Sequence, residues 1–109
     1  MFYIFRQNNS GDTFDYDEYV TKFVIIEADS LEDAKTKAFS IGIYYYGVQK
    51  ELDCDCCGDR WWTPDESETL AIYDEPLDDD NLIKDLKSPK DCVCRVFYKN
   101  GSIAEYSKI

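Results

Sequence analysis

Histidine is absent from this chain of 109 residues, and its absence removes a large class of catalytic sites. Nucleophilic catalysis by a Ser–His or Cys–His pair needs an imidazole as the base, so neither mechanism is available. Glycine is scarce as well, and the five scattered glycines form no phosphate-binding loop. Because no other catalytic constellation is recognisable, the sequence predicts a protein that is not an enzyme.

Positive charge is also limited. The chain has 12 Lys and Arg against 23 Asp and Glu, which gives a net charge of −11. Nucleic-acid backbones and anionic membranes bind basic surfaces, so we expect direct binding to neither. The charge opposes self-association, whereas an aromatic edge strand would favour a dimer. A monomer and a small homo-oligomer therefore both stay open.

Long apolar runs are missing too. No run approaches the ~18 residues of a membrane-spanning helix. The first residues lack the basic region and the long apolar region of a signal peptide. We therefore expect a cytoplasmic protein whose five cysteines are kept reduced. The length and the 44% hydrophobic content predict a single domain, residues 1–109, with one core.

The order of strand and helix patterns predicts an α+β fold, a small antiparallel-dominated sheet with one or two helices packed on one face. Residues 22–28 form a continuous apolar run that is typical of a central strand covered on both faces. A first helix is expected after Ser30, its N-cap, with an apolar face and with Gly42 as its stop. The apolar face of this helix consists of Leu31, Ala34, Ala38 and Ile41.

The second half of the chain has weaker signals. A second helix is expected from Pro76 to Leu86, with three aspartates in its first turn. Short strands are expected at residues 2–5 and 70–73, and a short strand or a packed extended segment at residues 43–46, whereas residues 47–68 read as irregular. A hairpin is expected to join residues 92–98 to residues 102–106, because Asn100-Gly101 is a strong turn signal.

The most unusual segment is a cysteine box that consists of Cys54, Cys56, Cys57, Gly58, Asp59, Arg60, Trp61 and Trp62. Cys54 and Cys57 have C-x-x-C spacing, and Cys92 and Cys94 add a C-x-C pair. Four thiolates in a tetrahedral array suit a structural zinc ion, so these four are candidate ligands. The favoured alternative is small buried thiols, since cysteine is among the most buried residue types. No other cofactor is expected.

The rest of the box has a structural interpretation. Nearby aspartates oppose a reactive thiol, and Asp59 can pair with Arg60. Trp61 and Trp62 are adjacent, so in an extended segment one is expected in the core and the other as an exposed anchor. We expect the box to be a folded loop whose loss destabilises its surroundings.

Residues 65–80 hold eight acids and no Lys or Arg. Carboxylates are ligands for Mg²⁺ or Ca²⁺, but Asp78, Asp79 and Asp80 lack the spacing and the glycine of an EF-hand. We expect an acidic binding face here; the alternative is a surface that is only solvated. The candidate binding residues are Asp65, Glu66, Glu68, Asp74, Glu75, Asp78, Asp79 and Asp80.

Three segments together resemble a known group of proteins: residues 28–34, residues 42–48 and the D-C-x-C-C-G-D-R-W box at residues 53–61. They are similar to small uncharacterised proteins of tailed bacteriophages. The resemblance covers roughly residues 22–62, shares Cys54, Cys56 and Cys57, and does not extend to Cys92 and Cys94. It implies an accessory phage protein made in a bacterial cytoplasm, and it brings no catalytic role.

Three functions then stay open. The first is an accessory protein that binds and inhibits a basic host protein through the acidic face, as a DNA mimic does. The second is an anti-defence protein that sequesters a nucleotide or another small molecule. It would stack bases on aromatic side chains and hold phosphates with Lys50, Arg60 and Arg95. The third is a structural or virion-associated protein without a ligand. The stacking candidates are Tyr44, Tyr45, Tyr46, Trp61 and Trp62.

Overall fold

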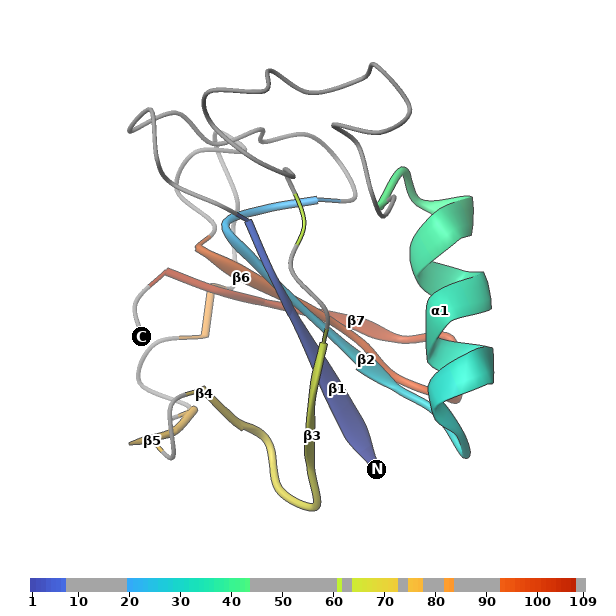
Figure 1. Cartoon of the computed structure of the whole chain (residues 1–109). Coiled ribbons are helices and arrows are strands. Elements are labelled where there is room, and N and C mark those ends of the chain that lie inside the picture. Colours follow the sequence, from blue (N-terminus) through green and yellow to red (C-terminus); the bar gives the residue numbers. More distant parts are fainter. Residues whose placement is uncertain are drawn as a thin grey trace.

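The fold is known from a computed structural model, which describes residues 1–7, 20–43, 61, 64–72, 75–77, 82–83 and 93–107. Its centre is a five-stranded sheet with the strand order β3–β1–β2–β6–β7 (Figure 1). A separate two-stranded sheet pairs β4 with β5. The strands are β1 Phe2–Arg6, β2 Phe23–Glu27, β3 Asp65–Ser67, β4 Ala71–Ile72, β5 Glu75–Pro76, β6 Cys94–Phe97 and β7 Ile103–Tyr106.

Antiparallel pairing dominates the large sheet. The pairs β1–β2, β1–β3 and β6–β7 are antiparallel, and only β2–β6 is parallel among the described strands. A helix, α1 (Leu31–Ser40), follows β2 and packs on one face of the sheet (Figure 1). The predicted fold class, an antiparallel-dominated sheet with a helix on one face, is therefore confirmed.

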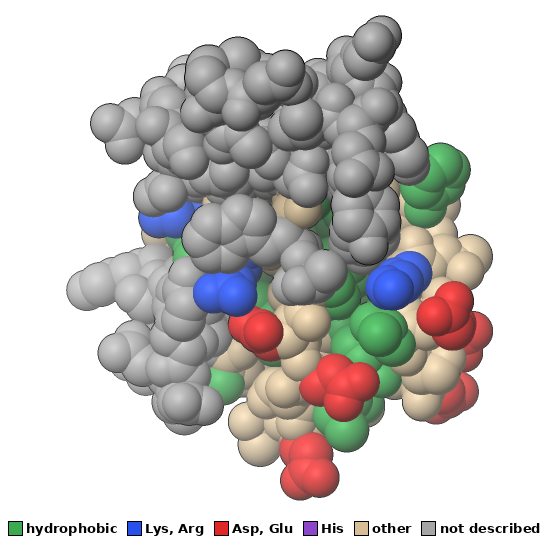
Figure 2. All heavy atoms as spheres, in the orientation of Figure 1, with side chains coloured by type: hydrophobic (Ala, Val, Ile, Leu, Met, Phe, Trp, Pro, Cys, Tyr) green, Lys and Arg blue, Asp and Glu red, His purple; other side chains and the backbone are tan. Residues whose placement is uncertain are grey.

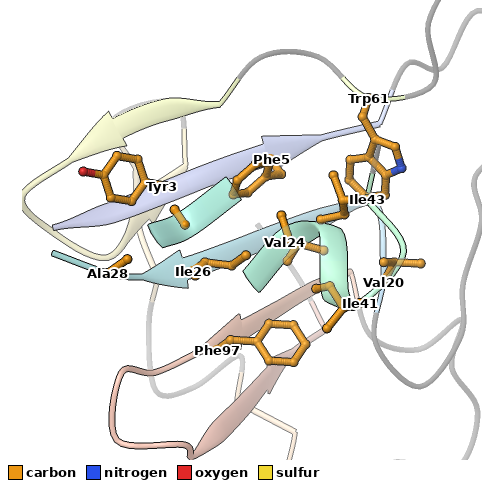
Figure 3. Packing of buried hydrophobic residues seen from close by; sticks show 12 residues of the cluster. Tyr3, Phe5, Val20, Val24, Ile26, Ala28, Ile41, Ile43, Trp61 and Phe97 are labelled. Carbon is orange, nitrogen blue, oxygen red and sulfur yellow. The ribbon is translucent and has the colours of Figure 1, made fainter. Parts of the chain in front are cut away.

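The central strand is β2, as its apolar run predicts. Val24, Ile25 and Ile26 are all buried, because both faces of the sheet are covered. On the helix face, Val24 and Ile26 join a cluster that also includes side chains of β1, α1 and β6 (Figure 3). On the opposite face, Ile25 joins a second cluster, which leucines from the segments around β4 and β5 cover. The members of that cluster include Ile4, Phe23, Cys94, Val96 and Tyr106, with Leu70, Leu77 and Leu82 packed against them.

Helix α1 follows the sequence signals closely. The Ser30 hydroxyl accepts a hydrogen bond of 3.2 Å from the backbone N–H of Asp33, so Ser30 is the N-cap. Ala34 and Ala38 are fully buried, and their small side chains let the helix approach the sheet. Gly42 has a φ of +102°, a left-handed conformation that suits glycine and ends the helix.

The β6–β7 hairpin is confirmed as well. Gly101 has a φ of +93°, and the side-chain oxygen of Asn100 accepts a hydrogen bond from the Ser102 N–H at 2.9 Å. The predicted strand at residues 2–5 is β1, and β4 lies within the predicted strand at 70–73. Ile43 is buried but is not part of a strand, and residues 44–46 lie outside the described residues.

Two expectations for the middle of the chain are wrong. Pro76 lies in β5, Leu82 forms a bridge with Tyr106, and the Ile83 N–H donates to the Glu105 carbonyl at 2.7 Å. The described residues of the expected second helix are therefore not helical, because their backbone pairs with other segments of the chain. In addition, Asp65–Ser67 of the supposedly irregular stretch is the edge strand β3, paired with β1.

Candidate functional site

The described part of the predicted acidic patch lies on β3 and in the turn after it. Asp65, Glu66 and Glu68 are exposed. Asp65 forms an ion pair of 3.0 Å with Arg6 of β1, so its charge is locally compensated. Glu75 lies in β5. The other predicted members, Asp74, Asp78, Asp79 and Asp80, lie outside the described residues.

Sequence reasoning missed the acids that the fold brings next to β3. Glu32 and Asp33 are exposed in the first turn of α1, and Asp29 is exposed in the turn before it. Figure 2 shows acidic side chains gathered on one side of the molecule, over β3 and the start of α1. We use the term acidic face for Asp29, Glu32, Asp33, Glu66 and Glu68. The only sequence signal for the helix members is the preference of acids for a helix N-terminus.

The negative charges of carboxylates from these segments act together on the side chain of Tyr3. Tyr3 lies on β1 opposite Glu66 and is only 3% exposed. Burial raises the pKa of the Tyr3 phenol, and the negative charges of Glu66, Asp29 and Asp33 raise it further. Three carboxylates that are distant in sequence therefore act on one tyrosine.

A cleft of about 270 Å³ lies between α1 and the β6–β7 hairpin, and Asp29 and Asp33 of the acidic face line part of it. Across its rim, the Lys99 ammonium pairs with the Asp29 carboxylate, and the Lys99 backbone N–H donates to Glu27 at 3.0 Å. The hydrogen bond from Lys99 lowers the pKa of Asp29, and the same bond raises the pKa of Lys99. The lining residues are Ile26, Glu27, Ala28, Asp29, Asp33, Lys37, Phe97, Tyr98, Lys99 and Gly101.

One box residue, Trp61, lies within the described structure. It is 4% exposed, forms a bridge with Gln7 at the end of β1, and packs near Ile43 in the helix-side cluster (Figure 3). The prediction that one of the two tryptophans belongs to the core is confirmed for Trp61. The remaining box residues, Cys54, Cys56, Cys57, Gly58, Asp59, Arg60 and Trp62, lie outside the described residues.

Of the four candidate zinc ligands, the structure describes Cys94. Its thiol is fully buried in the cluster opposite the helix, where its neighbours are apolar. This environment fits a small buried thiol. Cys54, Cys57 and Cys92 lie outside the described residues, and the described ranges contain no group of three potential metal ligands. The zinc site stays a prediction.

Two residues of the nucleotide hypothesis have other roles. Trp61 is in the core, and Arg95 is 2% exposed and ion-paired with Glu105 at 3.1 Å. Neither is placed to meet a ligand at the surface. The other residues of that hypothesis, Tyr44, Tyr45, Tyr46, Lys50, Arg60 and Trp62, lie outside the described residues.

Among the described residues, no helix has the length and apolar character needed to cross a membrane.

Comparison with known proteins identifies the family of the chain. No curated protein and no solved structure matches the chain. A family model described as "Domain of unknown function (DUF7296)" matches residues 1–109, so the chain belongs to the DUF7296 family.

Proposed function

We propose that this protein is a non-enzymatic phage accessory protein that acts in the bacterial cytoplasm. It binds a basic host protein through the acidic face and inhibits that protein by occluding its surface. One observation carries the proposal: the acidic face joins carboxylates in and next to β3 and the start of α1, and most of them form no ion pair with another described residue. Among the described residues, Asp29 is the one member of the face with an ion-pair partner.

Uncompensated carboxylates on rigid elements favour a cationic partner. Like charges held close together repel, and a cation that binds to them relieves the repulsion. Helix α1 holds Glu32 and Asp33, and the edge strand β3 holds Glu66, in fixed positions, so little conformational entropy of these acids is lost on binding. Electrostatic complementarity of this kind gives fast association and strong sensitivity to salt.

DNA-binding proteins are the class of partner that we favour. Duplex DNA carries one negative charge per ~1.7 Å of its axis, so proteins that bind it present matching basic surfaces. A folded acidic surface competes with DNA for such a surface without being a nucleic acid. This mode of action needs no catalytic group on the chain.

The test uses the immobilised protein and the DNA-binding fraction of a bacterial extract. We expect a basic protein to be retained at about 0.05 M salt, where surface charges are weakly screened, and released at about 0.5 M. Duplex DNA should compete for it. The triple variant Glu32→Gln/Glu66→Gln/Glu68→Gln should lose most of the retention. If no basic protein is retained at low salt, the proposal is wrong and a structural role without a ligand is favoured.

A further inference from the structure

The cleft beside α1 has the size of a side-chain pocket. Its volume of about 270 Å³ is below the ~300–1,000 Å³ of most small-molecule sites. Asp33 and Lys37, one helical turn apart, line its helix side, and Phe97 lines it from the sheet. Asp29 and Asp33 belong both to the cleft and to the acidic face, so the two are continuous.

The charges in the cleft divide into two groups. Lys99 contacts both Glu27 and Asp29 and so connects the hairpin to the end of β2 and to the turn before α1. Asp33 and Lys37 are left, and neither forms an ion pair with another described residue. The Lys37 ammonium instead lies over the Phe97 ring, 5.5 Å from its centroid. The cleft therefore already holds a cation against an aromatic ring, and it also contains the Asp33 carboxylate, which forms no ion pair with another described residue.

We propose that the cleft receives an arginine side chain of the basic partner. The inference rests on the proposed function and names the anchor of that contact. The guanidinium pairs with the Asp33 carboxylate and takes the place of the Lys37 ammonium over Phe97, while Lys37 turns toward solvent. Arginine suits this position better than lysine, because its planar and weakly hydrated group pairs with carboxylates and stacks on rings.

An anion fits the cleft poorly. Three carboxylates line it against two ammonium groups, and the Lys99 ammonium is already paired with Asp29. A phosphate or a carboxylate ligand would have to approach Glu27 and Asp33 as well as Lys37. The charge balance therefore favours a cation, and inorganic phosphate serves as the opposing probe.

The test is a titration of the ¹⁵N-labelled full chain with N-acetyl-argininamide, followed by NMR. We expect saturable shifts of backbone amides along the cleft, those of Lys37, Tyr98, Lys99 and Gly101. N-acetyl-citrullinamide has nearly the same shape without the charge, and it should cause no saturable shift. Equal binding of the two probes, or saturable shifts of these amides with inorganic phosphate, would overturn the inference.

Two matched pairs of variants separate the cleft from the overall charge. Asp33→Asn should weaken argininamide binding roughly threefold to tenfold, as the loss of one partly exposed charge pair does. Asp65→Asn removes the same charge outside both the cleft and the acidic face, where Asp65 pairs with Arg6 at 3.0 Å, and should leave binding unchanged. Lys37→Met should tighten binding. Lys22→Met should not, although Lys22 also lies over a ring, that of Phe23 at 5.5 Å. Equal effects within either pair would overturn the inference.

The failure of this inference differs from the failure of the proposed function. If a basic host protein is retained by the acidic face but Asp33→Asn binds argininamide as the wild type does, only the inference is wrong. If no basic protein is retained at low salt, the proposed function is wrong, whatever the probe does.

Discussion

Arg95 of β6 and Glu105 of β7 are direct register partners, and Arg95 Nη2 lies 3.1 Å from Glu105 Oε2. The Arg95 side chain is only 2% exposed, whereas that of Glu105 is 28% exposed. A guanidinium in this position is always charged, so it needs a nearby anion to offset its desolvation. Arg95 therefore stabilises the hairpin, although by composition it is one of the few cations that a phosphate ligand could use.

Glu105→Gln tests this role. The variant removes the anion and leaves the buried guanidinium, so we expect a loss of about 1–3 kcal/mol in the free energy of unfolding, measured by urea denaturation. Glu66→Gln is the matched control, because Glu66 is exposed and forms no ion pair with a described residue. Its effect should stay within about 0.5 kcal/mol. Equal stability of the two variants would show that Glu105 does not compensate Arg95.

Tyr3 predicts a loss of stability at alkaline pH. Its pKa is raised above the ordinary value of 10.0 in the folded protein, first by burial and then by Glu66, Asp29 and Asp33. The folded state therefore holds the phenolic proton more tightly than the unfolded chain does. As the pH rises above 10, the unfolded chain ionises first, and the stability of the fold decreases.

The measurement compares thermal unfolding of the wild type and of Tyr3→Phe between about pH 8 and pH 11. The variant should lose less stability above pH 10 than the wild type. The pKa of the Lys99 ammonium is also raised, so its deprotonation contributes to the change of stability at alkaline pH. This contribution is the same in both proteins and cancels in the comparison. Identical pH profiles would contradict the effect assigned to Tyr3.

Trp61 allows a test of the interpretation that the cysteine box is a structural element. Because it is buried in the helix-side cluster, Trp61→Ala should lower the free energy of unfolding by about 3–5 kcal/mol. Phe39→Ala is the control, since Phe39 is an aromatic residue of α1 that is 69% exposed and should have little effect. A Trp61→Ala variant that unfolds like the wild type would contradict the interpretation of the box as a structural element.

The helix cap is a smaller and more local test. Ser30→Ala removes the acceptor of the Asp33 N–H and should cost about 1 kcal/mol of stability. Ser40→Ala removes a hydroxyl at the other end of α1, which donates to the Lys37 carbonyl at 2.6 Å. We expect this change to matter less, because it removes no N-cap acceptor. Equal losses of stability for the two variants would show that the N-cap hydrogen bond of Ser30 has no special importance.

The sequence predicts best the features that depend on neighbouring residues. The cap at Ser30, the stop at Gly42 and the turn at Gly101 follow from local backbone chemistry, and all three are present. The central position of β2 follows from its unbroken apolar run. These signals do not depend on which strands pair.

The errors occur where the structure depends on pairing between segments that are distant in the sequence. Charges in residues 76–86 favour a helix. Instead, Pro76 pairs with β4 as part of β5, and Leu82 forms a bridge with Tyr106. The acidic face is another example, because proximity in sequence groups Glu66 with the acids up to Asp80. Pairing of β3 with β1 instead places it where it acts on Tyr3 together with Asp29 and Asp33.

The most direct test of the acidic face compares two neighbouring residues of β3. Asp65 is already paired with Arg6, and Glu66 has no ion-pair partner among the described residues. The association rate constant of each variant with the retained basic protein is measured against salt concentration. We predict that Glu66→Gln slows association and flattens its salt dependence, whereas Asp65→Asn changes both much less. Association that does not depend on salt, or equal effects of the two substitutions, would contradict the account.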